Sequence, residues 1–148
     1  MRRVNRLLLL GLMIGAAGLS GCQKHTANQE YEHPAVVEHI DGSELSRVTL
    51  TPKAMERLDV KTAEVSEQKG SRNEAPQKSV PYAALLYDAH GTTFVYKSPK
   101  ERVFVRHSID VDYIEGDVVY LKDGPETGTQ VATIGVAEIY GTEFEVGH

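Results

Sequence analysis

A series of short β-type segments separated by tight turns fills most of the chain between Ser79 and Tyr140. Two apolar segments flank the polar loop at residues 88–91, which ends in glycine, and this pattern predicts a hairpin. Apolar and polar residues then alternate from Val103 to Tyr113, which predicts a half-buried antiparallel strand or two strands that meet at a bend. Three further strands are expected at residues 118–121, 131–134 and 136–140. The fold class predicted is mainly β, as one small antiparallel β-barrel or β-roll.

The segment before this block predicts two more strands, a short helix and a third strand. The strands are expected at residues 34–40, 47–50 and 60–65. Thr51 is the expected N-cap of the helix, Pro52 occupies its first position, and the helix ends before Asp59. Residues 66–78 are polar and are predicted to form a loop. Residues 34–148 therefore form a single β-rich domain in this prediction. Its expected core residues are Val80, Tyr82, Leu85, Phe94, Val105, Ile109 and Val119.

The first residues have the pattern of an export signal. Residues 1–6 are basic, and an apolar run from Leu7 to Leu19 follows, which is short for a bilayer span. The sequence Leu19-Ser20-Gly21-Cys22 comes next and resembles the lipobox of bacterial lipoproteins. That resemblance implies a signal peptide at residues 1–21 and lipid attachment to Cys22, the single cysteine of the chain. Residues 22–33 are polar and are predicted to form a flexible tether.

The charge balance of the mature chain limits its possible partners. Removing Arg2, Arg3 and Arg6 from the 16 basic residues leaves 13 against 21 acidic ones, a formal charge of −8. This acidity argues against binding to nucleic acid and against a polybasic contact with anionic lipid. The sequence thus predicts attachment to the membrane through lipid on Cys22, which holds a protein stably when two or more acyl chains are present.

Several motifs resemble the membrane-proximal domain of periplasmic adaptor proteins, also called membrane fusion proteins, of resistance-nodulation-division efflux pumps. In that family a strand ends in Pro-x-x-Ala-Val-x-x-Asp-x-x-Gly and leads into Val-Tyr. The positions here that match or substitute conservatively are Pro81, Ala84, Leu85, Asp88, Gly91, Val95 and Tyr96. The spacing of the family's later glycine motif is kept by Gly124, Gly128, Val131 and Gly135. Residues 48–63 resemble the family's N-terminal strand, helix and strand, which join the same domain.

A full adaptor carries a barrel domain, a lipoyl-like domain and usually a helical hairpin between these two segments, where this chain has only residues 66–78. The resemblance therefore implies a truncated lipoprotein form that keeps the part facing the inner-membrane transporter. It predicts a lipid-anchored, non-catalytic accessory or docking subunit of a transmembrane efflux or transport system. The expected location is the bacterial cell envelope, facing the periplasm, with the choice of inner or outer membrane open. The expected partner is an efflux transporter or a full-length adaptor protein.

Two alternatives follow from the same residues. His25, His33 and His39 lie among glutamates near the N-terminus and are weak candidates for metal ligands, because their spacing fits no helical pair or compact loop motif. They allow a small periplasmic metal- or solute-binding lipoprotein. The chain could also be a degraded adaptor that has lost its partner. No nucleophile motif and no phosphate-binding loop is present, so neither an enzyme activity nor a cofactor is predicted.

Overall fold

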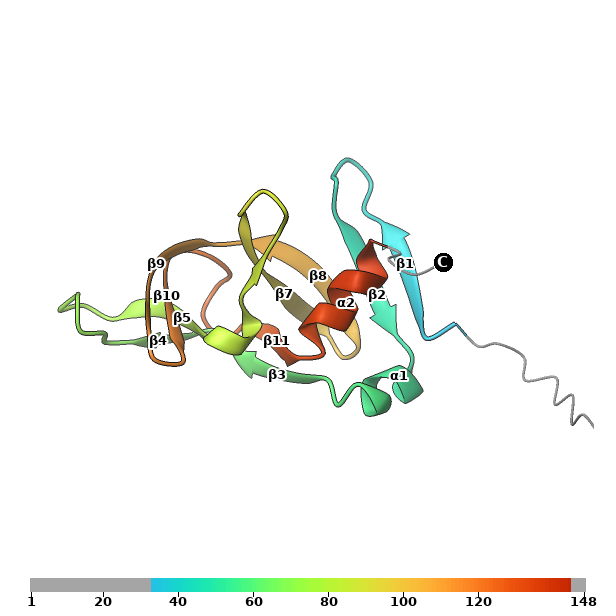
Figure 1. Cartoon of the computed structure of the whole chain (residues 1–148), viewed down its shortest axis with the longest axis horizontal. Helices are drawn as coiled ribbons and strands as arrows, with labels where there is room; N and C mark the ends of the chain where they lie inside the picture. Colours follow the sequence, from blue (N-terminus) through green and yellow to red (C-terminus); the bar gives the residue numbers. More distant parts are fainter. Residues whose placement is uncertain (1–32, 145–148) are drawn as a thin grey trace, which may run out of the picture. The chain divides into compact units, whose positions relative to one another are not determined.

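The computed structural model describes residues 33–144, which form two antiparallel sheets and two α-helices (Figure 1). The larger sheet has the strand order β1-β2-β8-β7-β11-β3, with β6 beside β7, and the smaller sheet has the order β4-β5-β10-β9. The strands are β1 (Ala35–His39), β2 (Ser46–Leu50), β3 (Lys61–Glu64), β4 (Ser66–Gln68), β5 (Gln77–Pro81), β6 (Leu86–Tyr87), β7 (Thr93–Lys100), β8 (Val103–Ser108), β9 (Asp110–Glu115), β10 (Val118–Asp123) and β11 (Gln130–Ile134). The helices are α1 (Pro52–Arg57) and α2 (Val136–Glu143), with a 3-10 turn η1 (Tyr82–Ala84). The mainly β, antiparallel fold class is confirmed, although the two sheets do not close into a barrel.

The chain passes between the two sheets four times, at three short junctions and through residues 124–129 between β10 and β11. Val65 separates β3 from β4, Ile109 separates β8 from β9, and Pro81 leads from β5 through η1 into β6. Val65 and Ile109 are both buried in the core next to the smaller sheet. The alternating segment from Val103 to Tyr113 is therefore two strands that meet at a bend, which is one of the two predicted forms.

The upstream segment completes the larger sheet. Strand β2 lies between β1 and β8, and β3 pairs with β11. Helix α1 connects β2 to β3. The predicted N-cap is present, because Thr51 Oγ1 accepts a hydrogen bond from the Ala54 amide at 3.1 Å. The sheet thus joins residues from both ends of the described sequence, as β2 and β3 each pair with a strand that begins at Val103 or later.

Two hydrophobic clusters fill the domain. The first lies between the larger sheet and the two helices and contains Val48, Leu50, Ala54, Phe94, Tyr96, Phe104, Ala132, Val136 and Ile139. The second lies between the two sheets and contains Val65, Val80, Ala84, Val95, Ile109, Val119, Leu121 and Val131. Five of the predicted core residues are buried: Val80, Phe94, Val105, Ile109 and Val119. Leu85 is half-buried. Tyr82 was predicted wrongly, since it is 50% exposed. Pro81 ends β5 just before it, and the 3-10 turn that follows places Tyr82 outside the strand pattern.

Residues 136–140 form part of helix α2 and not the predicted strand. Val136, Ile139 and Glu143 are its buried residues, and their spacing of three and four positions places them on one helical face. Gly135 precedes the helix with φ +78°, a conformation that disfavours a strand continuing through it. The buried residues of this segment therefore recur with the period of a helix and do not alternate as the residues of a half-buried strand would.

The polar segment at residues 66–78 is a hairpin rather than a loop throughout. Strand β4 pairs with β5 in the register Ser66↔Ser79, Glu67↔Lys78 and Gln68↔Gln77. The loop itself covers residues 69–76. Strand β4 lies at the edge of the smaller sheet, where polar side chains meet solvent, and this accounts for a strand without an apolar pattern.

Gly70→Ala is expected to destabilise this hairpin loop. A Cβ at Gly70 would lie 1.8 Å from Tyr113 Oη and 2.9 Å from ring atoms of Tyr120, so the loop must shift away from the stacked tyrosine pair. The overpacking costs about 1–3 kcal/mol, which urea denaturation can measure. Gly141→Ala in α2 is the control, because nothing lies within 4 Å of a Cβ there and its backbone is helical, so no loss of stability is expected. An equal loss of stability in the two variants would contradict the proposed contact with Tyr113.

Candidate functional site

A buried ionic cluster holds the end of α2 against the larger sheet. The Glu143 side chain is 3% exposed and accepts a hydrogen bond from the Tyr96 hydroxyl, while its Oε1 lies 3.3 Å from Arg106 Nη2. Tyr96 and Arg106 are direct cross-strand partners on β7 and β8. Burial and the bond to Glu143 raise the pKa of Tyr96, so the hydroxyl stays protonated and donates. We call Tyr96, Arg106 and Glu143 the α2 clasp.

Aromatic rings surround the α2 clasp. The Arg106 guanidinium carbon lies 4.9 Å from the Phe144 ring centroid and 5.5 Å from that of Phe94. Tyr140 stacks on Phe94 with 5.7 Å between ring centroids. The Glu143 carboxylate is thus enclosed by its own partners and presents almost no surface to a ligand. We interpret the α2 clasp as a device that fastens the helix.

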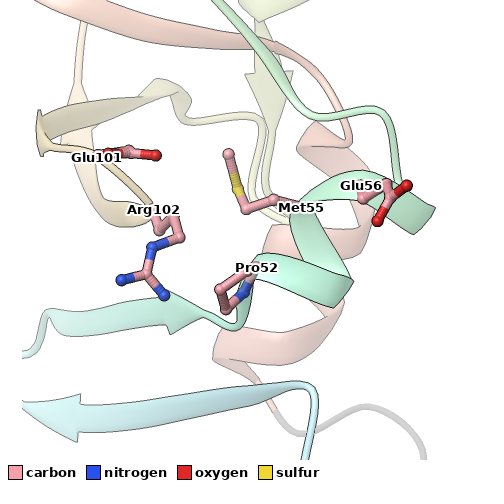
Figure 2. Close-up of a pocket in the computed structure, with 5 residues that line it drawn as sticks. All are labelled: Pro52, Met55, Glu56, Glu101 and Arg102. Atoms are coloured by element: carbon pink, nitrogen blue, oxygen red, sulfur yellow. The ribbon is translucent and has the colours of Figure 1, made fainter.

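The candidate binding surface is a concave region between α1 and the two-residue turn that joins β7 to β8. It has a volume of about 540 Å³ and is lined by Pro52, Met55, Glu56, Glu101 and Arg102 (Figure 2). We call it the α1 hollow. Met55 extends toward the turn that carries Arg102, and Glu56 lies on the side of the helix away from that turn (Figure 2). The lining therefore combines apolar surface with an arginine and two carboxylates.

The position of Arg102 is set by its own backbone. Its φ is +65°, an uncommon conformation for a residue other than glycine. The Leu50 amide donates to the Arg102 carbonyl at 2.9 Å, and Arg102 Nη1 donates to the Leu50 carbonyl at 3.4 Å. These contacts join the turn to the end of β2, directly before α1. Backbone strain of this kind often accompanies a functional site.

The α1 hollow suits recognition better than reaction chemistry. No serine, cysteine or histidine lines it, so a nucleophile–base pair is absent from its lining residues. Arginine stays protonated and binds carboxylates through paired hydrogen bonds, while Pro52 and Met55 offer contact to an apolar side chain. A surface of this composition can hold a peptide segment of another protein.

The structure describes only two of the candidate site residues that the sequence singled out, His33 and His39. Cys22 and His25 lie outside the described residues, and His33 and His39 are exposed. Within residues 33–144, no group of three or more histidine, cysteine or acidic side chains is arranged to hold a metal ion. In the same range, no helix has the length and apolar character needed to cross a membrane.

Asp112 and His107 are two further polar residues of the sheets. Asp112 accepts a hydrogen bond from Gln77 Nε2 at 3.0 Å, which ties β9 to the β4–β5 hairpin. His107 is half-buried on β8, where burial first and then the charge of Lys97 lower its pKa. The α1 hollow and the α2 clasp were both missed at the sequence level, because each joins residues more than forty positions apart.

Comparisons with known proteins give no match to this chain, either among protein-family models or among curated proteins. The likeness to efflux adaptors therefore depends on the motifs quoted above.

Proposed function

We propose that this protein is a lipid-anchored envelope protein that acts as a non-catalytic docking subunit of a transmembrane efflux or transport system. It is held by lipid on Cys22 and faces the periplasm. Its partner is the transporter or a full-length adaptor protein. The anchor, the compartment and the partner class come from the lipobox-like sequence and from the adaptor-like motifs.

The main support is the way in which two separate sequence segments form one domain. In full adaptors, the segment corresponding to residues 48–63 joins the domain formed by the later strands. Here β2 pairs with β8 and β3 pairs with β11, so the two segments of this chain also form one domain. The β4–β5 hairpin directly connects the two segments where an adaptor has its additional domains. A membrane-proximal domain without its arm would have this organisation.

The α1 hollow is the proposed docking surface. The Thr51 amide donates to the Pro34 carbonyl at 2.9 Å, so the start of α1 lies beside the point where β1 begins. The predicted tether enters the domain at this point. With lipid on Cys22, the eleven residue-to-residue steps from Cys22 to His33 would span at most about 40 Å. The α1 hollow would then stay within reach of a membrane protein.

Cross-linking in intact cells, followed by identification of the captured proteins, tests the proposal. We expect a transmembrane transport protein or a full-length adaptor among the cross-linked products of the wild-type chain. Products that contain neither class would contradict the docking function. Capture of a soluble enzyme or a metal carrier alone would point to another role.

Arg102→Glu is expected to weaken this capture without unfolding the domain. The substitution replaces the arginine that lines the α1 hollow with a third carboxylate, which would oppose an acidic group of the partner and typically costs several kcal/mol. Arg102 makes one long side-chain hydrogen bond, so the loss of folding stability should stay near 1 kcal/mol. The measurement is the yield of the cross-linked product relative to wild type. Lys122→Glu, at an exposed position on β10, is the control and should leave the yield unchanged.

A further inference from the structure

Strand β1 ends the larger sheet with an open edge. It pairs with β2 in the register Ala35↔Leu50 through His39↔Ser46 and with no other strand among residues 33–144. Two backbone hydrogen bonds fix which residues face β2: the Thr51 amide donates to the Pro34 carbonyl at 2.9 Å, and the Ile40 amide donates to the Leu45 carbonyl at 3.0 Å. Even-numbered residues of β1 therefore direct their main-chain groups toward β2. The intervening residues, Ala35, Val37 and His39, direct theirs away from the sheet.

The side chains of β1 add an apolar contact to this edge. Val36 is 56% exposed, the highest value among the large hydrophobic residues that are exposed between residues 33 and 144. It lies on the opposite face of β1 from Ala35 and Val37, which pack against the core below α2. Strand β1 contains no lysine or proline of its own, the residues that commonly protect an edge from further pairing. An edge of this kind can accept another strand.

We propose that β1 pairs with β1 of a second copy of this chain, antiparallel and with a two-fold axis at Val36. In this register, Val36 of one copy faces Val36 of the other at a non-hydrogen-bonded position, where side chains are closest. Ala35 of each copy then faces Val37 of the other, and each pair exchanges two main-chain hydrogen bonds. The contact is self-complementary, as a two-fold interface requires.

The position of Pro34 is compatible with this register. Pro34 falls opposite Glu38 of the second copy, at a position whose main-chain groups face β2, so its missing N–H removes no bond between the copies. Glu38 lies 3.6 Å from Arg47 of its own chain, so each carboxylate has a cation beside it. The two glutamates therefore do not face each other across the axis.

The chain that precedes β1 favours a second copy as the occupant, and this step rests on the proposed lipid anchor. The two Pro34 residues would be offset by four positions, or about 14 Å along the strands. Two tethers that each span up to about 40 Å can then reach one bilayer. A contact of one strand per copy is smaller than a stable interface of about 1,200–2,000 Å². Anchoring in a common membrane raises the effective concentration of the second copy and offsets this small area.

A single engineered cysteine tests the pairing in cells. In a non-hydrogen-bonded antiparallel pair the Cα atoms lie about 4.5 Å apart, within the range that a disulfide spans. We expect the full chain carrying Val36→Cys, oxidised with copper phenanthroline in intact cells, to show a doubled apparent mass on a non-reducing gel. Reduction should restore the single-chain mass. Tyr87→Cys on β6, with 54% exposure, is the matched control and should stay mainly at the single-chain mass.

Further variants distinguish a failure of the proposed β1 pairing from a failure of the proposed lipid anchor. Adding Ala35→Pro to Val36→Cys removes an outward amide without breaking a β1–β2 hydrogen bond, and it should abolish the doubled mass. The wild-type chain reports on Cys22, because a lipidated cysteine cannot form a disulfide. If the wild-type chain itself dimerises through Cys22, the lipid anchor is wrong. In that case, Val36→Cys in a Cys22→Ser background tests the β1 pairing without interference from a second cysteine.

The proposal is overturned if Val36→Cys gives no more doubled product than Tyr87→Cys. It is also overturned if the oxidised product has a mass that differs from twice the chain, since another protein would then occupy the β1 edge. Persistence of the doubled product in the Ala35→Pro variant would likewise contradict pairing through β1.

Discussion

Glu143→Ala should lower the free energy of unfolding by about 3–5 kcal/mol, because breaking a buried ion pair leaves its other charge uncompensated. The Arg106 side chain is 20% exposed, which places the expected loss toward the lower end of that range. The substitution also removes the acceptor of the Tyr96 hydroxyl. Such a loss is a large share of the 5–15 kcal/mol typical of a domain. Urea denaturation followed by circular dichroism measures it.

Glu138→Ala is the matched control for this experiment. Glu138 lies on the same helix but is exposed in its first turn, so its replacement should cost less than about 1 kcal/mol. Tyr96→Phe should cost about 1–3 kcal/mol, and its effect should not add to that of Glu143→Ala because the two side chains share a hydrogen bond. Equal losses for Glu143→Ala and Glu138→Ala would show that the α2 clasp does not hold the helix.

Cys22→Ser should abolish incorporation of palmitate completely. In the proposed anchor, every acyl chain is attached to this residue or to the new N-terminus that it forms, and the chain contains no second cysteine. Metabolic labelling of cells that express the wild-type chain or the variant, followed by purification and autoradiography, measures the incorporation. His25→Ala, in the adjoining segment, should leave the label unchanged. Labelling that survives Cys22→Ser would contradict the lipid anchor.

Local patterns predicted much of the fold correctly. Thr51 and Pro52 marked the start of α1, and alternation predicted β8 and β9, which belong to different sheets and meet at a bend. Helix α2 was missed because Val136, Ile139 and Tyr140 were interpreted as strand residues. Their spacing of three and four positions is the helical period and could have identified it. Strand β4 was missed because an edge strand in contact with solvent needs no apolar pattern.

Local sequence patterns could not predict the candidate site, because its residues lie far apart in the sequence. The α1 hollow joins α1 to a turn about fifty residues later, and the α2 clasp joins Tyr96 to Glu143. Such pairs depend on the register of β2, β8 and β7, which becomes fixed when the sheet forms. The histidines drew attention because of their chemistry, yet His33 and His39 are exposed and belong to no metal-binding group among residues 33–144.

Site-specific photo-cross-linking from the α1 hollow tests the docking function most directly. A photoreactive residue in place of Glu101 would lie on the turn that lines the hollow, and one in place of Lys122 would lie on the exposed surface of β10. We expect position 101, in cells that express the full chain, to capture a transmembrane transport protein or a full-length adaptor, and position 122 not to do so. Capture of neither class from position 101, or equal capture from both positions, would contradict the docking function.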